Sequence, residues 1–198
     1  KLVSDVYRTI MRQKLLFMQA PTGVGKTIST IFPAVKAVGE ELADRIFYLT
    51  AKTITATVAK ETFALLEKNG YRAKTIQITA KEKLCPCDEM ECNPVTCPYA
   101  KGHFDRVNDA VFDLLHRCEM IERDDILSQA DRYTVCPFEL CLDTASWCDN
   151  IICDYNYVFD PNVYLKRFFQ EGLQGDYIFL IDEAHPLVER TRVMSSAP

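Results

Sequence analysis

Residues 20–27 read Ala-Pro-Thr-Gly-Val-Gly-Lys-Thr, and this stretch with its flanks decides the fold. The apolar run 15–18, Leu-Leu-Phe-Met, comes before it and has the length of a short strand. Helical spacing follows from about residue 26 to 39. A glycine-bearing loop between a strand and a helix is typical of a phosphate-binding loop. The stretch therefore matches a relaxed Walker A pattern, with Ala20 where the first glycine often stands.

The residue types of this loop suit a nucleotide. Gly23 and Gly25 let backbone amides surround phosphate oxygens at a helix N-terminus. Lys26 can reach the β and γ phosphates, and the Thr27 hydroxyl can bind Mg²⁺. A chance glycine-rich turn is the alternative. The predicted nucleotide-binding residues are Ala20, Pro21, Thr22, Gly23, Val24, Gly25, Lys26 and Thr27.

Strands and helices alternate outside the middle of the chain. Strands are predicted at 15–18, 45–50, 74–78, 150–153 and 177–181, and helices at 4–13, 26–39 and 53–68. This alternation predicts a doubly wound parallel α/β sheet.

Residues 178–185 read Ile-Phe-Leu-Ile-Asp-Glu-Ala-His, a buried-strand pattern that runs into two carboxylates. The carboxyl edge of a parallel sheet is where nucleotide sites lie. We expect Asp182 to hold Mg²⁺ and Glu183 to polarise the attacking water. An ordinary acidic turn is the alternative, but the phosphate loop supplies the other half of one Mg–nucleotide site.

Composition narrows the class of protein. The chain has 198 residues and a net charge of −5, which argues mildly against a basic protein that coats nucleic acid. It begins at Lys1 rather than Met, so we expect a fragment of a longer protein. No signal peptide or membrane-length apolar run is present. All nine cysteines fall within residues 85–153. Such clustering favours metal or cluster binding over a secreted disulfide scaffold.

The phosphate loop, the Asp-Glu-Ala-His string and the cysteines between them resemble the XPD/DinG family of superfamily 2 DNA helicases. Residues 49–56 resemble its strand-contacting motif, and residues 153–161 resemble the segment after its cluster domain. The resemblance implies an α/β, RecA-like P-loop NTPase with an inserted, mostly helical iron–sulfur domain. Residues 1–80 would form the first part of motor domain 1, 81–149 the insertion, and 150–198 the return to the motor.

The family pattern implies four ligands to a [4Fe-4S] cluster: Cys85, Cys92, Cys97 and Cys136. Cys87 is the rival to Cys85. Zinc is the competing interpretation, but no Cys-x-x-Cys pair is present. We interpret the other cysteines as small buried hydrophobes: Cys118, Cys141, Cys148 and Cys153.

The resemblance further implies an ATP-dependent helicase of 5′ to 3′ polarity that acts on single-stranded and forked DNA in repair or replication. His185 would link hydrolysis to a second motor domain that is absent from this sequence. A cytoplasmic or nucleoid-associated monomer is expected. Pro186 departs from the family, which commonly has Asn there. A nuclease or translocase with the same motor, and a cluster-bearing binding module without activity, remain alternatives.

Basic, hydroxyl and aromatic side chains are the expected contacts to a single strand. We interpret His103 and His116 as solvated residues rather than metal ligands. The candidate DNA contacts are Lys52, Thr53, Thr55, Tyr99, Lys101, Phe104, Arg106, Tyr155 and Tyr157.

Overall fold

The computed structural model describes residues 1–19, 25–173, 175–184 and 187. Contacts divide the chain into two compact units. Unit 1 consists of residues 1–71 and 149–198, and unit 2 of residues 72–148. Each unit is described by itself.

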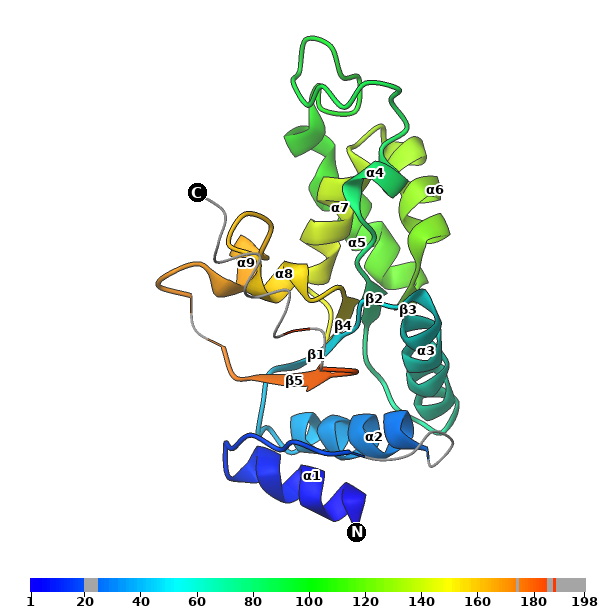
Figure 1. Cartoon of the computed structure of the whole chain (residues 1–198). Coiled ribbons are helices and arrows are strands. Elements are labelled where there is room, and N and C mark those ends of the chain that lie inside the picture. The colour runs from blue at the N-terminus through cyan, green and yellow to red at the C-terminus, as the bar shows by residue number, and fades with distance from the viewer. Residues whose placement is uncertain (20–24, 174, 185–186, 188–198) are drawn as a thin grey trace. The chain divides into compact units, whose positions relative to one another are not determined.

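Unit 1 contains helices packed on a parallel sheet (Figure 1). Its strands are β1 (Arg45–Leu49), β4 (Asn150–Cys153) and β5 (Tyr177–Ile181), and its helices are α1 (Leu2–Met11), α2 (Lys26–Gly39), α3 (Thr53–Lys68), α8 (Asn156–Phe159) and α9 (Lys166–Phe169).

Strand β1 lies between the other two strands of unit 1. Ile46 is in register with Asn150 of β4 and with Ile178 of β5, both parallel. From Ile46 to Leu49 the strand is fully buried, which is why it reads as a continuous apolar run. The parallel α/β architecture predicted for this part of the chain is confirmed.

The predicted strand at Leu15–Met18 is wrong. These residues form no ladder, and the side chains of Leu15 and Phe17 are 87% and 86% exposed. An apolar run gives the composition of a strand, but a strand also needs a pairing partner, and residues 15–18 pair with none of the strands of the described sheet, whose last strand is β5.

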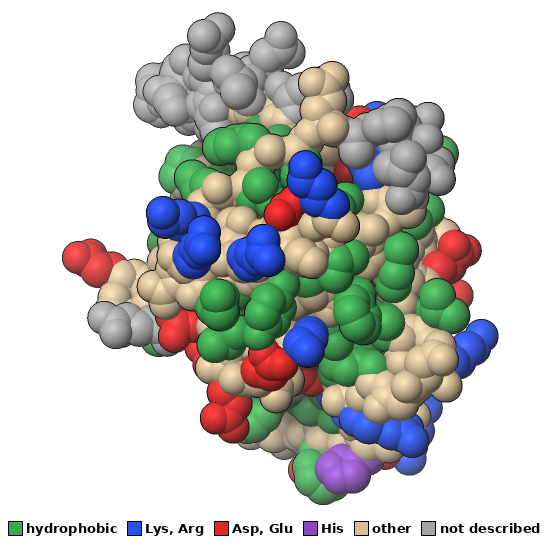
Figure 2. All heavy atoms as spheres, turned by 90° about the horizontal axis from the view of Figure 1, so that it is seen from below, with side chains coloured by type: hydrophobic (Ala, Val, Ile, Leu, Met, Phe, Trp, Pro, Cys, Tyr) green, Lys and Arg blue, Asp and Glu red, His purple; other side chains and the backbone are tan. Residues whose placement is uncertain are grey.

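Helices α1 and α2 pack together and leave a shallow groove of about 350 Å³, lined in part by Tyr7, Phe32 and Lys36. Figure 2 views the molecule from this side and shows hydrophobic side chains between Lys and Arg side chains. No helix in the described part of the chain is long and apolar enough to cross a membrane.

Unit 2 is mainly helical. It contains α4 (Lys81–Leu84), α5 (His103–Arg117), α6 (Arg123–Tyr133) and α7 (Pro137–Ala145), with the short parallel strands β2 (Thr75–Gln77) and β3 (Met120–Ile121).

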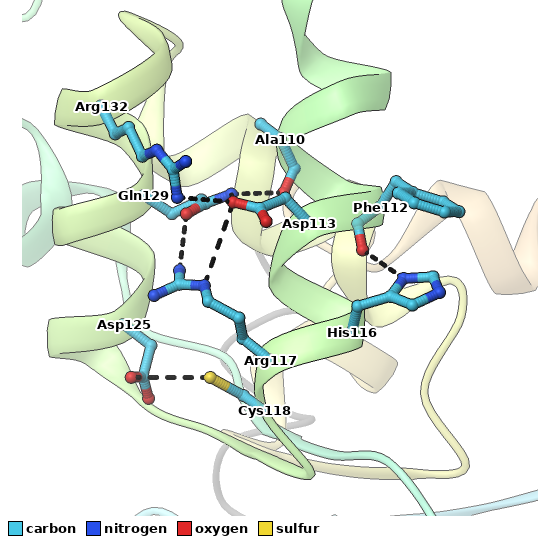
Figure 3. Close-up of polar contacts among 9 residues, drawn as sticks. All are labelled: Ala110, Phe112, Asp113, His116, Arg117, Cys118, Asp125, Gln129 and Arg132. Atoms are coloured by element: carbon cyan, nitrogen blue, oxygen red, sulfur yellow. Dashed lines mark hydrogen bonds and ion pairs between the residues drawn. The ribbon is translucent and has the colours of Figure 1, made fainter.

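A polar network joins α5 to α6 in unit 2 (Figure 3). The side chain of Gln129 is fully buried, and its amide donates to the Ala110 carbonyl at 2.8 Å and to Asp113 at 3.0 Å. Arg132 and Arg117 complete the network: Arg132 donates to Asp113 at 2.9 Å, and Arg117 donates to Gln129 at 2.6 Å.

Candidate functional site

Three of the phosphate-loop candidates, Gly25, Lys26 and Thr27, lie at the start of α2. Residues Ala20–Val24 are outside the described residues. Gly25 caps α2 with φ +69°, a left-handed conformation that strongly favours glycine. Lys26 and Thr27 form the first turn of α2, so the free amides of that turn accompany them. This geometry can bind an anion.

The phenol of Tyr48, which the sequence did not single out, joins the two halves of the candidate site. Tyr48 lies on β1, is 3% exposed and is hydrogen-bonded to the side chain of Thr27. Burial raises its pKa well above the ordinary value; the nearby Asp182 carboxylate adds to this, and the Thr27 bond opposes it. Thr27 and Asp182 are therefore both neighbours of one buried side chain.

The acidic pair follows β5 directly. The amide of Asp182 donates to the Leu49 carbonyl at 3.0 Å, which extends the ladder between β1 and β5 past the end of β5. Glu183 has φ +52°, a conformation that non-glycine residues adopt at a cost of about 1–3 kcal/mol and that clusters at functional sites. His185 and Pro186 lie outside the described residues.

The side chain of Tyr155 contacts the backbone of this acidic turn. It is 1% exposed, and its hydroxyl donates to the Asp182 carbonyl and lies 3.2 Å from the Glu183 carbonyl. The sequence interpretation of Tyr155 as a base-stacking residue is wrong, because its ring is buried. The only sequence feature that could have indicated this role is the position of Tyr155, two residues after β4.

The strand-contacting candidate Lys52 meets the same turn. Its ammonium forms a hydrogen-bonded ion pair with the Glu183 carboxylate. Thr53 and Thr55 follow in the first turn of α3. The segment expected to touch DNA and the carboxylate expected to activate water are thus in direct contact.

The cysteine candidates in unit 2 fall into two overlapping neighbourhoods. Lys81 is hydrogen-bonded to Cys92, which raises the lysine pKa; Cys136 and Cys85 also contribute to this rise, and burial opposes it. Desolvation raises the pKa of Cys87 to about 11, and its hydrogen bonds to Cys97 and Cys85 act in the same direction.

All four predicted ligands, Cys85, Cys92, Cys97 and Cys136, thus interact with Lys81 or with Cys87. Within the described residues, which include every cysteine, no three Cys, His, Asp or Glu side chains are placed to hold a single metal ion. Cys141, Cys148 and Cys153 are buried, as predicted, whereas Cys118 is only partly buried.

Two α5 side chains hold the segment that carries Cys136. The Cys136 amide donates to Nδ1 of His103 at 3.2 Å, and Nε2 of His103 lies 3.9 Å from the Asp143 carboxylate. Arg106 donates to the carbonyls of Tyr133 at 2.8 Å and Thr134 at 2.6 Å. The expectation of a solvated His103 is wrong, because it is only 4% exposed. His116 is exposed as expected.

The same Arg106 also reaches back toward Cys97. Its guanidinium donates to the Lys101 carbonyl at 2.8 Å, and the Lys101 amide donates to the Cys97 carbonyl at 3.2 Å. The first turn of α5 thus links the backbone near Cys97 to the backbone near Cys136. This makes Arg106 a structural clamp, although the sequence suggested a DNA contact.

A parallel sheet with a helix start and an acidic turn at its carboxyl edge is the arrangement of a RecA-like α/β fold. Two solved structures of similar fold are titled "XPD_Helicase" (TM-score 0.65, 18% identity, 97% of this chain and 33% of that chain) and "Truncated XPD" (TM-score 0.62, 18% identity, 94% and 52%). The chain thus spans about a third of the first and about half of the second.

The family model DEAD_2 matches residues 55–198. The chain belongs to the DEAD_2 family, and the predicted XPD/DinG-like helicase relationship is confirmed. No curated protein sequence matches it.

Proposed function

We propose that the chain forms the nucleotide-binding part of an ATP-dependent DNA helicase that moves 5′ to 3′ along single-stranded DNA. The observation that carries the proposal is the joining of Thr27 to the Asp182 side of the site through Tyr48. A hydroxyl and a carboxylate at the carboxyl edge of a parallel sheet suit Mg²⁺ held beside a nucleotide.

Each residue of the site has a chemical role in this proposal. The first-turn amides of α2 and Lys26 bind the phosphates, and Thr27 and Asp182 hold Mg²⁺, which neutralises phosphate charge when bound. Glu183 orients water and accepts its proton, while Tyr155 keeps the acidic turn in place. His185 would connect this site to a second motor domain, which the function requires.

The test uses the full-length protein that contains this chain. Lys26→Ala should lower ATP turnover at least a hundredfold and abolish strand separation of forked DNA, because the phosphates lose their cation. The control is Lys36→Ala, a lysine on the same helix whose pair with Glu40 is exposed. Unwinding that survives Lys26→Ala would refute the proposal. ATP-driven movement without unwinding would favour a translocase, and DNA binding without turnover would favour a binding module.

We further propose that Cys85, Cys92, Cys97 and Cys136 hold a [4Fe-4S] cluster. Support comes from the convergence of these thiols around Lys81 and Cys87, since a cation beside thiolates lowers the cost of their negative charge. The ligands of a four-iron cluster bind separate irons, so they lie farther apart than the donors to one ion. When bound, the cluster would pin unit 2, which guides single-stranded DNA in this proposal.

Iron and sulfide quantitation after oxygen-free purification tests the ligand set. About four irons per chain are expected, with loss of the visible absorption in Cys97→Ser and Cys136→Ser. Cys118→Ser is the matched control, because that thiol contacts Asp125 rather than the other cysteines. A zinc-containing colourless protein would refute the cluster.

The full-length protein, in this proposal, acts as a monomer on nucleoid DNA in repair or replication.

A further inference from the structure

The ion pair between Lys52 and Glu183 joins two motifs that are 131 residues apart in sequence. Lys52 follows β1, and Glu183 follows β5, the strand that pairs with β1 in parallel. Register alone brings the ends of these strands together, so the contact is a product of the sheet and not of a flexible loop.

The backbone at Lys52 is fixed by its neighbours. The Lys52 amide donates to the Thr50 hydroxyl at 3.2 Å, and the Thr55 hydroxyl donates to the Lys52 carbonyl at 3.0 Å. The hydroxyls of Thr50 and Thr55 are themselves hydrogen-bonded. The base of the lysine side chain is therefore held at the start of α3.

The backbone at Glu183 is fixed as well, by the Tyr155 hydroxyl and by its left-handed conformation. The two side chains are 60% and 38% exposed. Ion pairs this exposed contribute little and are easily exchanged for another partner. A DNA phosphate is such a partner for the ammonium, because phosphate is a strong acceptor for lysine.

We propose that Lys52 restrains Glu183 in the absence of DNA and releases it when a strand phosphate captures the ammonium. The carboxylate oxygen that accepts the hydrogen bond from the Lys52 ammonium is occupied and cannot accept one from the attacking water. Water activation by Glu183 is therefore reduced until the strand is bound. The proposal rests on the proposed function and assigns to one side chain both the sensing of the strand and the control of hydrolysis.

The experiment measures steady-state ATP turnover of the full-length protein with and without an excess of oligo-dT. Lys52→Met removes the charge and keeps the aliphatic stem. Its DNA-free kcat should rise about two- to fivefold, equivalent to roughly 0.4–1 kcal/mol at 1.4 kcal/mol per tenfold change. The KM for ATP should stay the same, and the stimulation by oligo-dT should fall by at least that factor.

Two variants separate this role from a structural one. Lys52→Arg keeps the cation and should keep both the low DNA-free turnover and the stimulation. Lys68→Met removes an exposed cation from the last turn of the same helix and should change neither. Screening offers a test on the unmodified protein: raising salt to about 0.5 M weakens exposed pairs, so DNA-free turnover should rise in wild type more than in Lys52→Met.

The outcomes are distinguishable. If wild type shows no DNA-stimulated turnover, the proposed function fails and the inference falls with it. If wild type is stimulated and Lys52→Met keeps the same DNA-free rate and stimulation, the inference alone is overturned. A proportional loss of both rates in Lys52→Met also overturns it, because Lys52 would then serve strand binding or folding only.

Discussion

Unit 1 and unit 2 both bury apolar side chains, but one region of each is built from a different kind of contact: the aromatic cluster around Phe47 in unit 1 and the polar network around Gln129 in unit 2. In unit 1 the ring of Phe47 is fully buried and lies 5.2–5.5 Å from four other aromatic rings, those of Phe168, Phe169, Tyr177 and Phe179. In unit 2 the amide side chain of Gln129 is fully buried like the apolar Leu114 of α5 and Ile126 of α6, but it is hydrogen-bonded to charged neighbours (Figure 3).

The difference affects how each unit tolerates change. Apolar burial is non-directional, so the cost of a substitution scales with the volume removed. A buried polar network depends on every member, because a donor or acceptor left without its bond costs more than the bond contributed. Substitutions in the Phe47 cluster should therefore weaken unit 1 in proportion to the volume removed, and isosteric polar changes in the Gln129 network should weaken unit 2 strongly.

The largest effect is expected for Phe47→Ala. Removing a buried ring costs about 3–5 kcal/mol of unfolding free energy, and hydrogen exchange should increase in unit 1 only. Phe32→Ala is the control, since Phe32 is 46% exposed on α2. An equal increase of exchange in residues 72–148 would mean that the units unfold together, and the comparison would fail.

Gln129→Met tests the polar side of the comparison at nearly constant volume. It removes three hydrogen bonds, to Ala110, Asp113 and Arg117. The expected loss is about 1–3 kcal/mol, seen as faster exchange across α5 and α6. Ser128→Ala, at an exposed position of the same helix, should be silent. A stabilised Gln129→Met protein would show that the network costs stability, as buried polar groups sometimes do.

The smallest expected effect is the pH dependence that Asp113 gives to the stability of unit 2. The hydrogen bond from Gln129 lowers the pKa of Asp113 below 3.8, and Arg132 and Arg117 lower it further. A folded-state pKa below the unfolded value means that the carboxylate stabilises unit 2 above pH 3.8 and that this is lost as pH falls toward the folded value.

The Tm of wild type should therefore fall more steeply below about pH 4 than that of Asp113→Asn. Asp109→Asn changes an exposed carboxylate of the same helix and should follow wild type. If Tm falls with pH in parallel for wild type and Asp113→Asn, ionisation of Asp113 does not contribute to the stability of the network.

The sequence predicted elements well where the pattern is local. The expected bounds of α2, α3, β4 and β5 match the structure, because periodic apolar residues and a Gly25 or Gly70 boundary act within one element. The strand predicted at residues 15–18 was wrong, because strand formation depends on pairing with segments that are distant in the sequence.

The candidate site was predictable only in part. Asp182 and Glu183 could be found because an apolar run of strand length ends there, although only Ile178 of β5 is buried in the structure. Tyr48, Tyr155 and His103 could not, because each acts through hydrogen bonds to residues distant in sequence, and no local spacing marks such contacts.

The discontinuity of unit 1 has a consequence during synthesis on the ribosome. Strand β1 emerges early, but the strands on both of its sides begin at Asn150 and Tyr177. Until those segments leave the exit tunnel, a buried apolar strand has no partner and remains available to chaperones or to aggregation. Unit 2 is one continuous segment whose helices contact elements close to them in sequence, so it can fold before β1 gains its partner strands.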